Sequence, residues 1–240
     1  MDIADNINLQ CLGYLEVERA GNHAVGLGVG PISADRPGGN SDRRGERVGS
    51  GLCACVTNPE ECRALVEAAV NEFGRVDCLV NNAGVSHVAP APSERPEDFR
   101  SVVDVNLFGA YWAAQAAARV MQSGSSIINV SSMLGLVKSA LPQAAYAASK
   151  AGLIGLTRDL SNQWSRRKGV RVNAIAPCFV ETDMISEMSS EHLRDFLSAC
   201  SLGRRATKRE IDGAVVFFAS AASSYITGST IAVDGGTSGH

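Results

Sequence analysis

Tyr146 and Lys150 are four residues apart, a spacing that places two side chains on the same face of a helix. A phenol has a pKa of about 10 in water, so it exchanges protons poorly at neutral pH. A neighbouring ammonium stabilises the phenolate and lowers that pKa. The pair is therefore a candidate for acid–base catalysis, although Tyr–Lys pairs are also common on ordinary exposed helix faces.

Polar residues also follow two apolar runs of the sequence. Ser132 comes shortly after the run 126–130, and the segment 81–84 (Asn-Asn-Ala-Gly) follows the run 76–80. A hydroxyl at a strand end can bind a substrate oxygen, and small residues let the backbone approach a flat ligand. Each feature alone also has a structural explanation, as a serine that closes a turn or as an Asn-Gly turn.

From residue 52 onward, apolar runs alternate with segments of helical periodicity. Strands are expected at 52–56, 76–80, 126–130, 170–176 and 230–233, and helices at 59–73, 96–121, 144–164, 190–199 and 208–219. Apolar strands that alternate with helices are typical of a parallel sheet covered on both faces. The sequence therefore predicts an α/β fold, a doubly wound parallel sheet of Rossmann type, as a single domain over residues 51–240.

Residues 1–50 form an atypical N-terminal segment. Ten of the 24 glycines occur by residue 51, and the stretch 31–47 has no apolar periodicity. We expect loop or disorder here, including residues 26–30 (Gly-Leu-Gly-Val-Gly), because no amphipathic helix follows them. The first βαβ unit is therefore expected to be degraded or irregular. Two explanations stay open, an out-of-frame or mis-spliced translation and a truly divergent cofactor domain.

The composition of the 240-residue chain is that of a globular protein, with 45% hydrophobic and 20% charged residues and a net charge of −3. No stretch is long enough to span a bilayer, and the first residues lack the order of a secretory signal. We expect a cytoplasmic protein without a membrane or nucleic-acid partner. The seven cysteines are an odd number, and the spacing of Cys53, Cys55 and Cys62 does not fit a zinc site, so we expect reduced thiols and no metal.

Several further motifs occur in order between residues 52 and 236. They are Asn81-Asn82-Ala83-Gly84, Val105-Asn106-Leu107, Asn129-Val130-Ser131-Ser132, Tyr146 with Lys150, the segment 177–184 (Pro-Cys-Phe-Val-Glu-Thr-Asp-Met) and the segment 226–236. In this combination the chain resembles the classical short-chain dehydrogenase/reductase family. Segments 151–157 and 181–184 are most similar to its 3-oxoacyl-carrier-protein-reductase-like branch, which contains enzymes for many substrates.

The resemblance implies an enzyme that transfers a hydride between NAD or NADP and a small alcohol or ketone. Tyr146 would be the general acid or base, Lys150 would lower its pKa and hold the nicotinamide ribose, and Ser132 would bind the reacting oxygen. Asn106 would hold a water that links Lys150 to solvent. The cofactor would also contact Val56, Asn82, Ala83 and Gly84 near its adenine and ribose, and Pro177, Val180 and Thr182 beside the nicotinamide. Family members are usually tetramers, so a homo-oligomer, either a tetramer or a dimer, is expected.

The sequence departs from the family at its start. The family opens with a strand, a Thr-Gly and two further glycines, where the pyrophosphate meets a helix N-terminus, and this turn cannot be recognised here. Two functions stay open. The complete Asn-Ser-Tyr-Lys set favours an active dehydrogenase/reductase for a secondary alcohol or ketone. The missing phosphate turn favours a non-catalytic relative that serves as a scaffold or oligomer partner.

Overall fold

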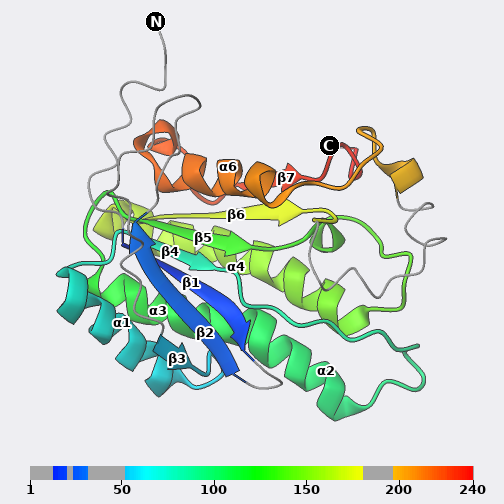
Figure 1. The fold of residues 1–240 in the computed structure, drawn as a ribbon, viewed down its shortest axis with the longest axis horizontal. Coiled ribbons are helices and arrows are strands. Elements are labelled where there is room, and N and C mark those ends of the chain that lie inside the picture. Colours follow the sequence, from blue (N-terminus) through cyan, green and yellow to red (C-terminus); the bar gives the residue numbers. More distant parts are fainter. Residues whose placement is uncertain (1–12, 21–23, 32–51, 181–196, 240) are drawn as a thin grey trace, which may run out of the picture.

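The computed structural model describes residues 13–20, 24–31, 52–180 and 197–239. Within these ranges, seven strands form one sheet with the order β3-β2-β1-β4-β5-β6-β7 (Figure 1). The strands are β1 (Gly13–Ala20), β2 (Ala24–Pro31), β3 (Leu52–Ala54), β4 (Cys78–Asn81), β5 (Ser126–Val130), β6 (Arg171–Pro177) and β7 (Thr230–Val233). The predicted α/β fold of Rossmann type is confirmed.

Five neighbouring strands of the sheet are parallel. β1 pairs with β4, and β5, β6 and β7 follow in that order. Side chains alternate between the two faces, so Leu79 and Ile127 join one hydrophobic core and Val80 and Ile128 join the other. Two apolar faces explain why these strands appear in the sequence as continuous apolar runs.

The N-terminal strands differ from the prediction. Residues 26–30, expected as a loop, lie within β2, which pairs antiparallel with both β1 and β3. Val25, Leu27 and Val29 alternate with glycines, and this period of two residues is typical of a strand. Three residues separate β1 from β2, too few for a crossover helix, so a hairpin takes the place of the first βαβ unit. The rest of residues 1–50 lies outside the described ranges.

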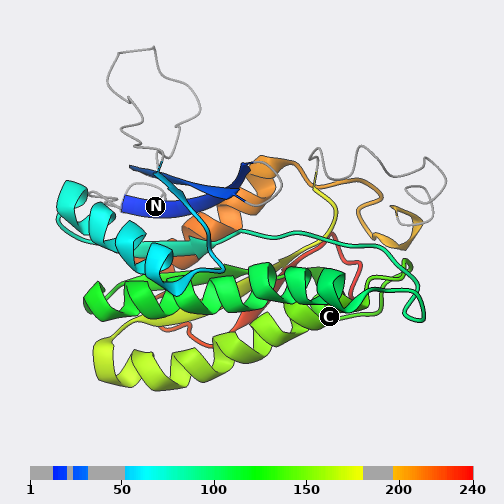
Figure 2. The same cartoon turned by 90° about the horizontal axis from the view of Figure 1, so that it is seen from below.

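Helices cover both faces of the sheet (Figures 1 and 2). They are α1 (Pro59–Phe73), α2 (Pro96–Val103), α3 (Ala110–Val120), α4 (Ala144–Lys168) and α6 (Lys208–Ala219). α1, α3 and α4 contribute to the core on one face, and α6 packs its fully buried Phe218 into the core on the other. The sheet is therefore doubly wound, as predicted. Within the described part of the chain, no helix is both long and apolar enough to cross a membrane.

The segment 96–121, predicted as one helix, contains an interruption. A π-helical turn at Asp104–Gly109 separates α2 from α3. π-Helical turns within α-helices are rare and often occur at functional sites. The predictions for α1, β5, α6 and β7 are confirmed to the residue, and α4 continues beyond Trp164 to Lys168. Of the helix predicted at 190–199, only residues 197–199 lie in the described ranges, and these are helical.

Candidate active site

Tyr146 and Lys150 lie one turn apart on α4, and Ser132 approaches them from the end of β5. The Lys150 Nζ is 5.7 Å from the centroid of the Tyr146 ring. It donates a hydrogen bond of 2.7 Å to the carbonyl oxygen of Val130, the last residue of β5. The Ser132 side chain lies close enough to the Tyr146 hydroxyl to lower the pKa of the phenol. Three of the four predicted catalytic residues thus meet at the carboxyl end of β5, the edge where ligands bind in this architecture.

Two contacts fix α4 against the turn that follows β5. The Ser131 hydroxyl donates a hydrogen bond of 2.8 Å to the carbonyl oxygen of Lys150. Gly135 packs so closely on α4 that a Cβ atom at this position would lie 2.9 Å from the backbone C and O of Lys150. Because both contacts involve the Lys150 backbone, they determine where Lys150 and Tyr146 stand relative to Ser132.

Asn106, the fourth predicted residue, is fully buried in the π-helical turn. Its Nδ2 donates hydrogen bonds of 3.0 Å to the Val85 carbonyl oxygen and 3.0 Å to the Ser149 hydroxyl. Its Oδ1 accepts a hydrogen bond of 2.8 Å from the Val85 N–H. The side chain therefore joins the turn after β4 to α4, and both of its N–H donors are used within the protein.

The segment 81–84 has two different roles in the structure. Asn81 is buried, and its Nδ2 donates to the Ala110 carbonyl oxygen at 3.0 Å and to the Asn129 Oδ1 at 2.8 Å. It therefore ties β4 to β5 and to the start of α3. Gly84 lies beside the catalytic cluster, because a Cβ atom there would come within 3.4 Å of the Lys150 Nζ. A glycine at this position keeps the backbone next to the ammonium open for a ligand.

Burial dominates the protonation of the two groups on α4. It lowers the pKa of Lys150 from 10.5 to about 8. It also raises the pKa of Tyr146 above its usual value, and the hydrogen bond with Ser132 opposes that rise only in part. The net direction of the Tyr146 pKa is thus set by burial, which the spacing of Tyr146 and Lys150 does not reveal. Tyr146 is a protonated phenol at neutral pH.

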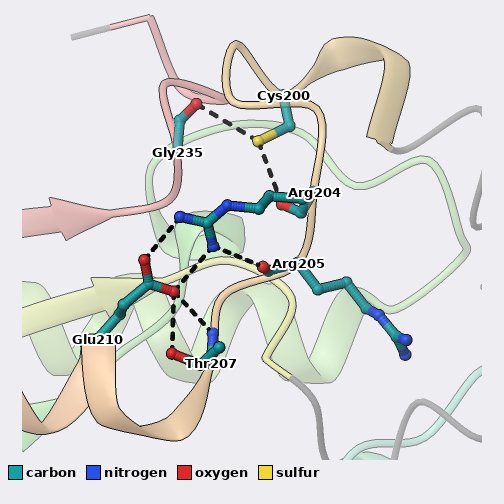
Figure 3. Close-up of polar contacts among 6 residues, drawn as sticks. All are labelled: Cys200, Arg204, Arg205, Thr207, Glu210 and Gly235. Carbon is teal, nitrogen blue, oxygen red and sulfur yellow. Dashed lines mark hydrogen bonds and ion pairs between the residues drawn. The ribbon is translucent and has the colours of Figure 1, made fainter.

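The loop before α6 adjoins the ends of β6 and β7 (Figure 3). The Arg204 guanidinium donates to both carboxylate oxygens of Glu210, at 2.9 and 2.7 Å, and Glu210 also accepts from the N–H and the hydroxyl of Thr207. The Cys200 thiol donates to the Gly235 carbonyl oxygen at 3.4 Å. Next to this loop lies a pocket of about 340 Å³. Its lining includes Cys178, Phe179, Leu202, Arg204, Glu210 and Asp234.

Comparisons with known proteins show the family of the chain. Residues 33–238 match the family model described as enoyl-(acyl carrier protein) reductase. The 3-oxoacyl-[acyl-carrier-protein] reductase of Vibrio cholerae serotype O1 is 40% identical over 190 residues, which cover 78% of this chain and 77% of that protein. The chain belongs to the classical short-chain dehydrogenase/reductase family. The 3-oxoacyl-carrier-protein-reductase-like branch is confirmed as well.

Two further members of the family extend this comparison. The short-chain type dehydrogenase/reductase y4vI of Sinorhizobium fredii is 40% identical over 212 residues, 85% of this chain, and the match spans only 38% of that protein. A gluconate 5-dehydrogenase from Burkholderia cenocepacia, solved with NADP and tartrate, is 33% identical with a TM-score of 0.72, over 77% of this chain and 73% of that one. A nicotinamide cofactor, NAD or NADP, is the cofactor class of this chain.

The nicotinamide side of this short-chain dehydrogenase/reductase fits such a cofactor. The open backbone at Gly84 and the buried ammonium of Lys150 lie together at the strand ends, where a ribose hydroxyl can accept a hydrogen bond. Pro177 ends β6 at the same edge, and Val180, half-buried, bridges to Ala206. Thr182 lies outside the described residues.

The adenine side matches the family less closely. The Val56 side chain is buried in the core, where a Cβ atom at Gly109 would come within 2.7 Å of it, so only its backbone can face a ligand. Asn82 is exposed and Ala83 half-buried. The glycines of residues 26–30 lie in an extended strand rather than at a helix start. In the described ranges, no helix begins between β1 and β2, where the family holds the pyrophosphate.

Three residues of the site were not found from the sequence. Ser131, Gly135 and Ser149 position the catalytic cluster, through hydrogen bonds or through close backbone packing. The sequence does carry a signal for Ser149, because it immediately precedes Lys150 and its place on the inner face of the helix puts it beside the catalytic residues. Nothing in the sequence indicates that Gly135 packs on α4, because that contact depends on the path of the loop.

Proposed function

We propose that the chain is an NAD(P)-dependent oxidoreductase that interconverts a secondary alcohol and a ketone. The observation that carries this proposal is the meeting of Tyr146, Ser132 and Lys150 at the carboxyl end of β5. Tyr146 and Ser132 bind the same carbonyl oxygen in this proposal, because their hydroxyls lie close enough to interact. In reduction Tyr146 gives its proton to that oxygen, and in oxidation it takes the proton back. The nicotinamide, when bound, supplies or accepts the hydride.

Lys150 and Asn106 support the proton transfer in this proposal. The Lys150 ammonium, close to the Tyr146 ring, stabilises the phenolate that forms when the proton leaves. It also binds the ribose hydroxyls of the cofactor. Asn106 holds a water that links Lys150 to solvent. Val85 and Ser149 use both N–H donors of the Asn106 side chain, so this water donates to an acceptor of Asn106, either its backbone carbonyl oxygen or the second lone pair of Oδ1.

The cofactor contacts extend along the same edge of the sheet. We assign them to Tyr146, Lys150, Asn82, Ala83 and Gly84, to Pro177, Val180 and Thr182 beside the nicotinamide, and to the backbone of Val56 near the adenine. Titration with NADH and with NADPH distinguishes between NAD and NADP as the cofactor.

The substrate side suits a neutral, mainly apolar molecule. A shallow cavity of about 260 Å³ lies at the start of α4, and it reaches Ala147, the neighbour of Tyr146. It is lined by Ala89, Ala91, Leu141, Pro142, Ala144, Ala147 and the uncharged polar residues Ser139 and Gln143. No charged side chain lines this cavity in the described residues, so it offers an ionised substrate group no partner.

One observation favours a second function. The β1–β2 hairpin stands where the family binds the pyrophosphate, and a relative that has lost cofactor binding could serve as a scaffold or oligomer partner. Titration of the purified chain with NADH and with NADPH, followed by nicotinamide fluorescence, separates the two functions. The oxidoreductase requires saturable binding of at least one cofactor. Absence of binding of both would defeat it and favour the scaffold.

We also propose a homo-oligomer, a tetramer or a dimer. Phe99 on α2 and Phe108 in the π-helical turn are 37% and 47% exposed, so both are available for contact with a second copy of the chain. Phe108→Asp is therefore expected to lower the mass of the assembly measured by sedimentation. Leu202→Asp, on a different surface, is expected to leave this mass unchanged. An unchanged mass for Phe108→Asp would place the interface elsewhere.

A cytoplasmic location completes the proposal. The described cysteines Cys55, Cys62, Cys78, Cys178 and Cys200 are free thiols. Free thiols in this number are typical of a reducing compartment.

A further inference from the structure

The Ser149 hydroxyl takes part in two hydrogen bonds at the turn of α4 that carries Tyr146 and Lys150. Its side chain is turned inward and only 1% exposed. Its hydroxyl accepts a hydrogen bond of 3.0 Å from the Asn106 Nδ2. It donates a hydrogen bond of 2.7 Å to the carbonyl oxygen of Tyr146, three residues earlier on α4. One hydroxyl therefore contacts the backbone of the catalytic tyrosine and the side chain of another site residue.

These bonds form a continuous connection between three elements. Asn106 holds the N–H and the carbonyl of Val85, in the turn after β4, and the same side chain reaches Ser149 on α4. Asn106 itself belongs to the π-helical turn between α2 and α3. The position of the Tyr146 backbone is thus coupled to the turn that carries Gly84, where a Cβ atom would lie 3.4 Å from the Lys150 Nζ.

A serine that bonds back to its own helix usually has a local effect only, a slight bend of that helix. Ser161 is an example on α4, because its hydroxyl donates to the Arg158 carbonyl oxygen at 2.8 Å. Ser149 makes the same kind of bond but also accepts from Asn106. This second bond is what lets the π-helical turn influence the turn of α4 that carries Tyr146.

We propose that Ser149 is a positioning residue for the proton transfer. By joining the Tyr146 backbone to the Asn106 side chain, it keeps the Tyr146 hydroxyl next to Ser132. The inference rests on the proposed oxidoreductase function. Its consequence is specific. Loss of the Ser149 hydroxyl impairs turnover, because the phenol is displaced from the reacting oxygen. Cofactor affinity changes little, because Lys150 keeps its bond to Val130 and its fixation by Ser131 and Gly135.

Ser149→Ala tests the proposal, with Ser161→Ala as the matched control. Alanine is a strong helix former, so both variants are expected to fold, and thermal unfolding checks this. The assay is the reduction of ethyl acetoacetate, a neutral keto ester, with the cofactor that binds in the fluorescence titration. We expect kcat of Ser149→Ala to fall by about tenfold to a hundredfold, the range that follows a small misplacement of a reacting group. The dissociation constant of the cofactor stays within about twofold.

Two further comparisons make the test decisive. Ser149→Thr keeps a hydroxyl at this position and is expected to recover most of the lost kcat, and Ser161→Ala keeps the wild-type kcat. Wild-type kcat in Ser149→Ala, or equal losses in the two alanine variants, would overturn the positioning role. A wild-type chain that is no faster than Tyr146→Phe would overturn the proposed function and the inference together.

Discussion

At the scale of single residues, Tyr146 is the group on which the proposed reaction depends. Its phenol interacts with Ser132, and burial keeps it protonated at neutral pH. Replacement by phenylalanine removes the transferable proton and leaves the ring in place. Tyr146→Phe is expected to lower kcat by about 10²- to 10⁴-fold, the usual contribution of a positioned acid or base. Steady-state kinetics measures this change.

A matched control is Tyr111→Phe. The Tyr111 hydroxyl lies on α3, where it accepts a hydrogen bond from Gln115, and the variant is expected to keep the wild-type kcat. Nicotinamide fluorescence is expected to report similar cofactor affinities for both variants. A large loss of cofactor binding in Tyr146→Phe would mean that Tyr146 has a structural role instead.

Lys150 makes stability depend on pH. Burial lowers its pKa from 10.5 to about 8, so the unfolded chain holds a proton between these pH values that the folded chain has released. The free energy of unfolding therefore rises with pH across this window, and the full destabilisation is present below about pH 8. Lys150→Met lacks this group. We expect the stability of the variant relative to wild type to fall by about 3 kcal/mol between pH 7 and pH 10.5.

Urea denaturation of both proteins at the two pH values measures this difference. Lys208→Met replaces an exposed lysine on α6, so its stability is expected to follow wild type at both pH values. Parallel behaviour of wild type and Lys150→Met would show that the ammonium carries no burial penalty.

At the scale of elements, the close approach of the turn after β5 to α4 sets the geometry of the site. A Cβ atom at Gly135 would lie 2.9 Å from backbone atoms of Lys150, which cannot move aside as a flexible side chain can. Gly135→Ala is expected to cost about 1–3 kcal/mol of stability and to lower kcat, because α4 must shift away from Ser132. Unfolding curves and kinetics measure both effects.

Gly155→Ala is the control on the same helix. Apart from the backbone of its own helix and its chain neighbours, no atom lies within 4 Å of a Cβ position at Gly155. Alanine there is therefore expected to stabilise the helix by about 0.5–1 kcal/mol and to leave kcat unchanged. If both alanine variants were equally stable and active, the close packing at Gly135 would have no part in the site.

The elements differ in how well the sequence predicts them. α1 is predicted to the residue, because Pro59 and the acidic first turn mark its start and Phe73 ends its periodicity before Gly74. The π-helical turn does not show in the sequence, because its alanine-rich surroundings hide a one-residue change of helical phase. The sequence predicts a loop where β2 lies, because glycines are typical of loops, although the apolar residues between them alternate as in a strand.

In the candidate active site, residue spacing predicts which side chains are neighbours, but it does not predict their burial or their contacts with distant segments. Spacing identified Tyr146, Lys150 and Ser132 as neighbours, since a helix repeat and strand ends follow from sequence. It did not reveal burial, and burial sets the direction of the tyrosine pKa. It also did not reveal Gly135, whose importance comes from a contact between a loop and a distant helix.

At the scale of the whole molecule, the sheet combines a family-like carboxyl-terminal part with an unusual start. The strands from β4 to β7 and their helices carry the catalytic cluster, and the family match covers them throughout. The β1–β2 hairpin occupies the place of the unit that binds the pyrophosphate in the family. The two halves of a dinucleotide are therefore expected to contribute unequally to binding.

Comparison of NADH and NADPH with reduced nicotinamide mononucleotide tests this inequality. Without a helix N-terminus directly after β1, the adenosine phosphate half gains few charge-assisted hydrogen bonds, so the dinucleotides are expected to bind less than about tenfold more tightly than the mononucleotide. Fluorescence titration of the three compounds measures the ratio. Lys150→Met, which would remove the proposed contact to the ribose that all three share, is expected to weaken all three alike. A dinucleotide that binds about a thousandfold more tightly than the mononucleotide would contradict the prediction.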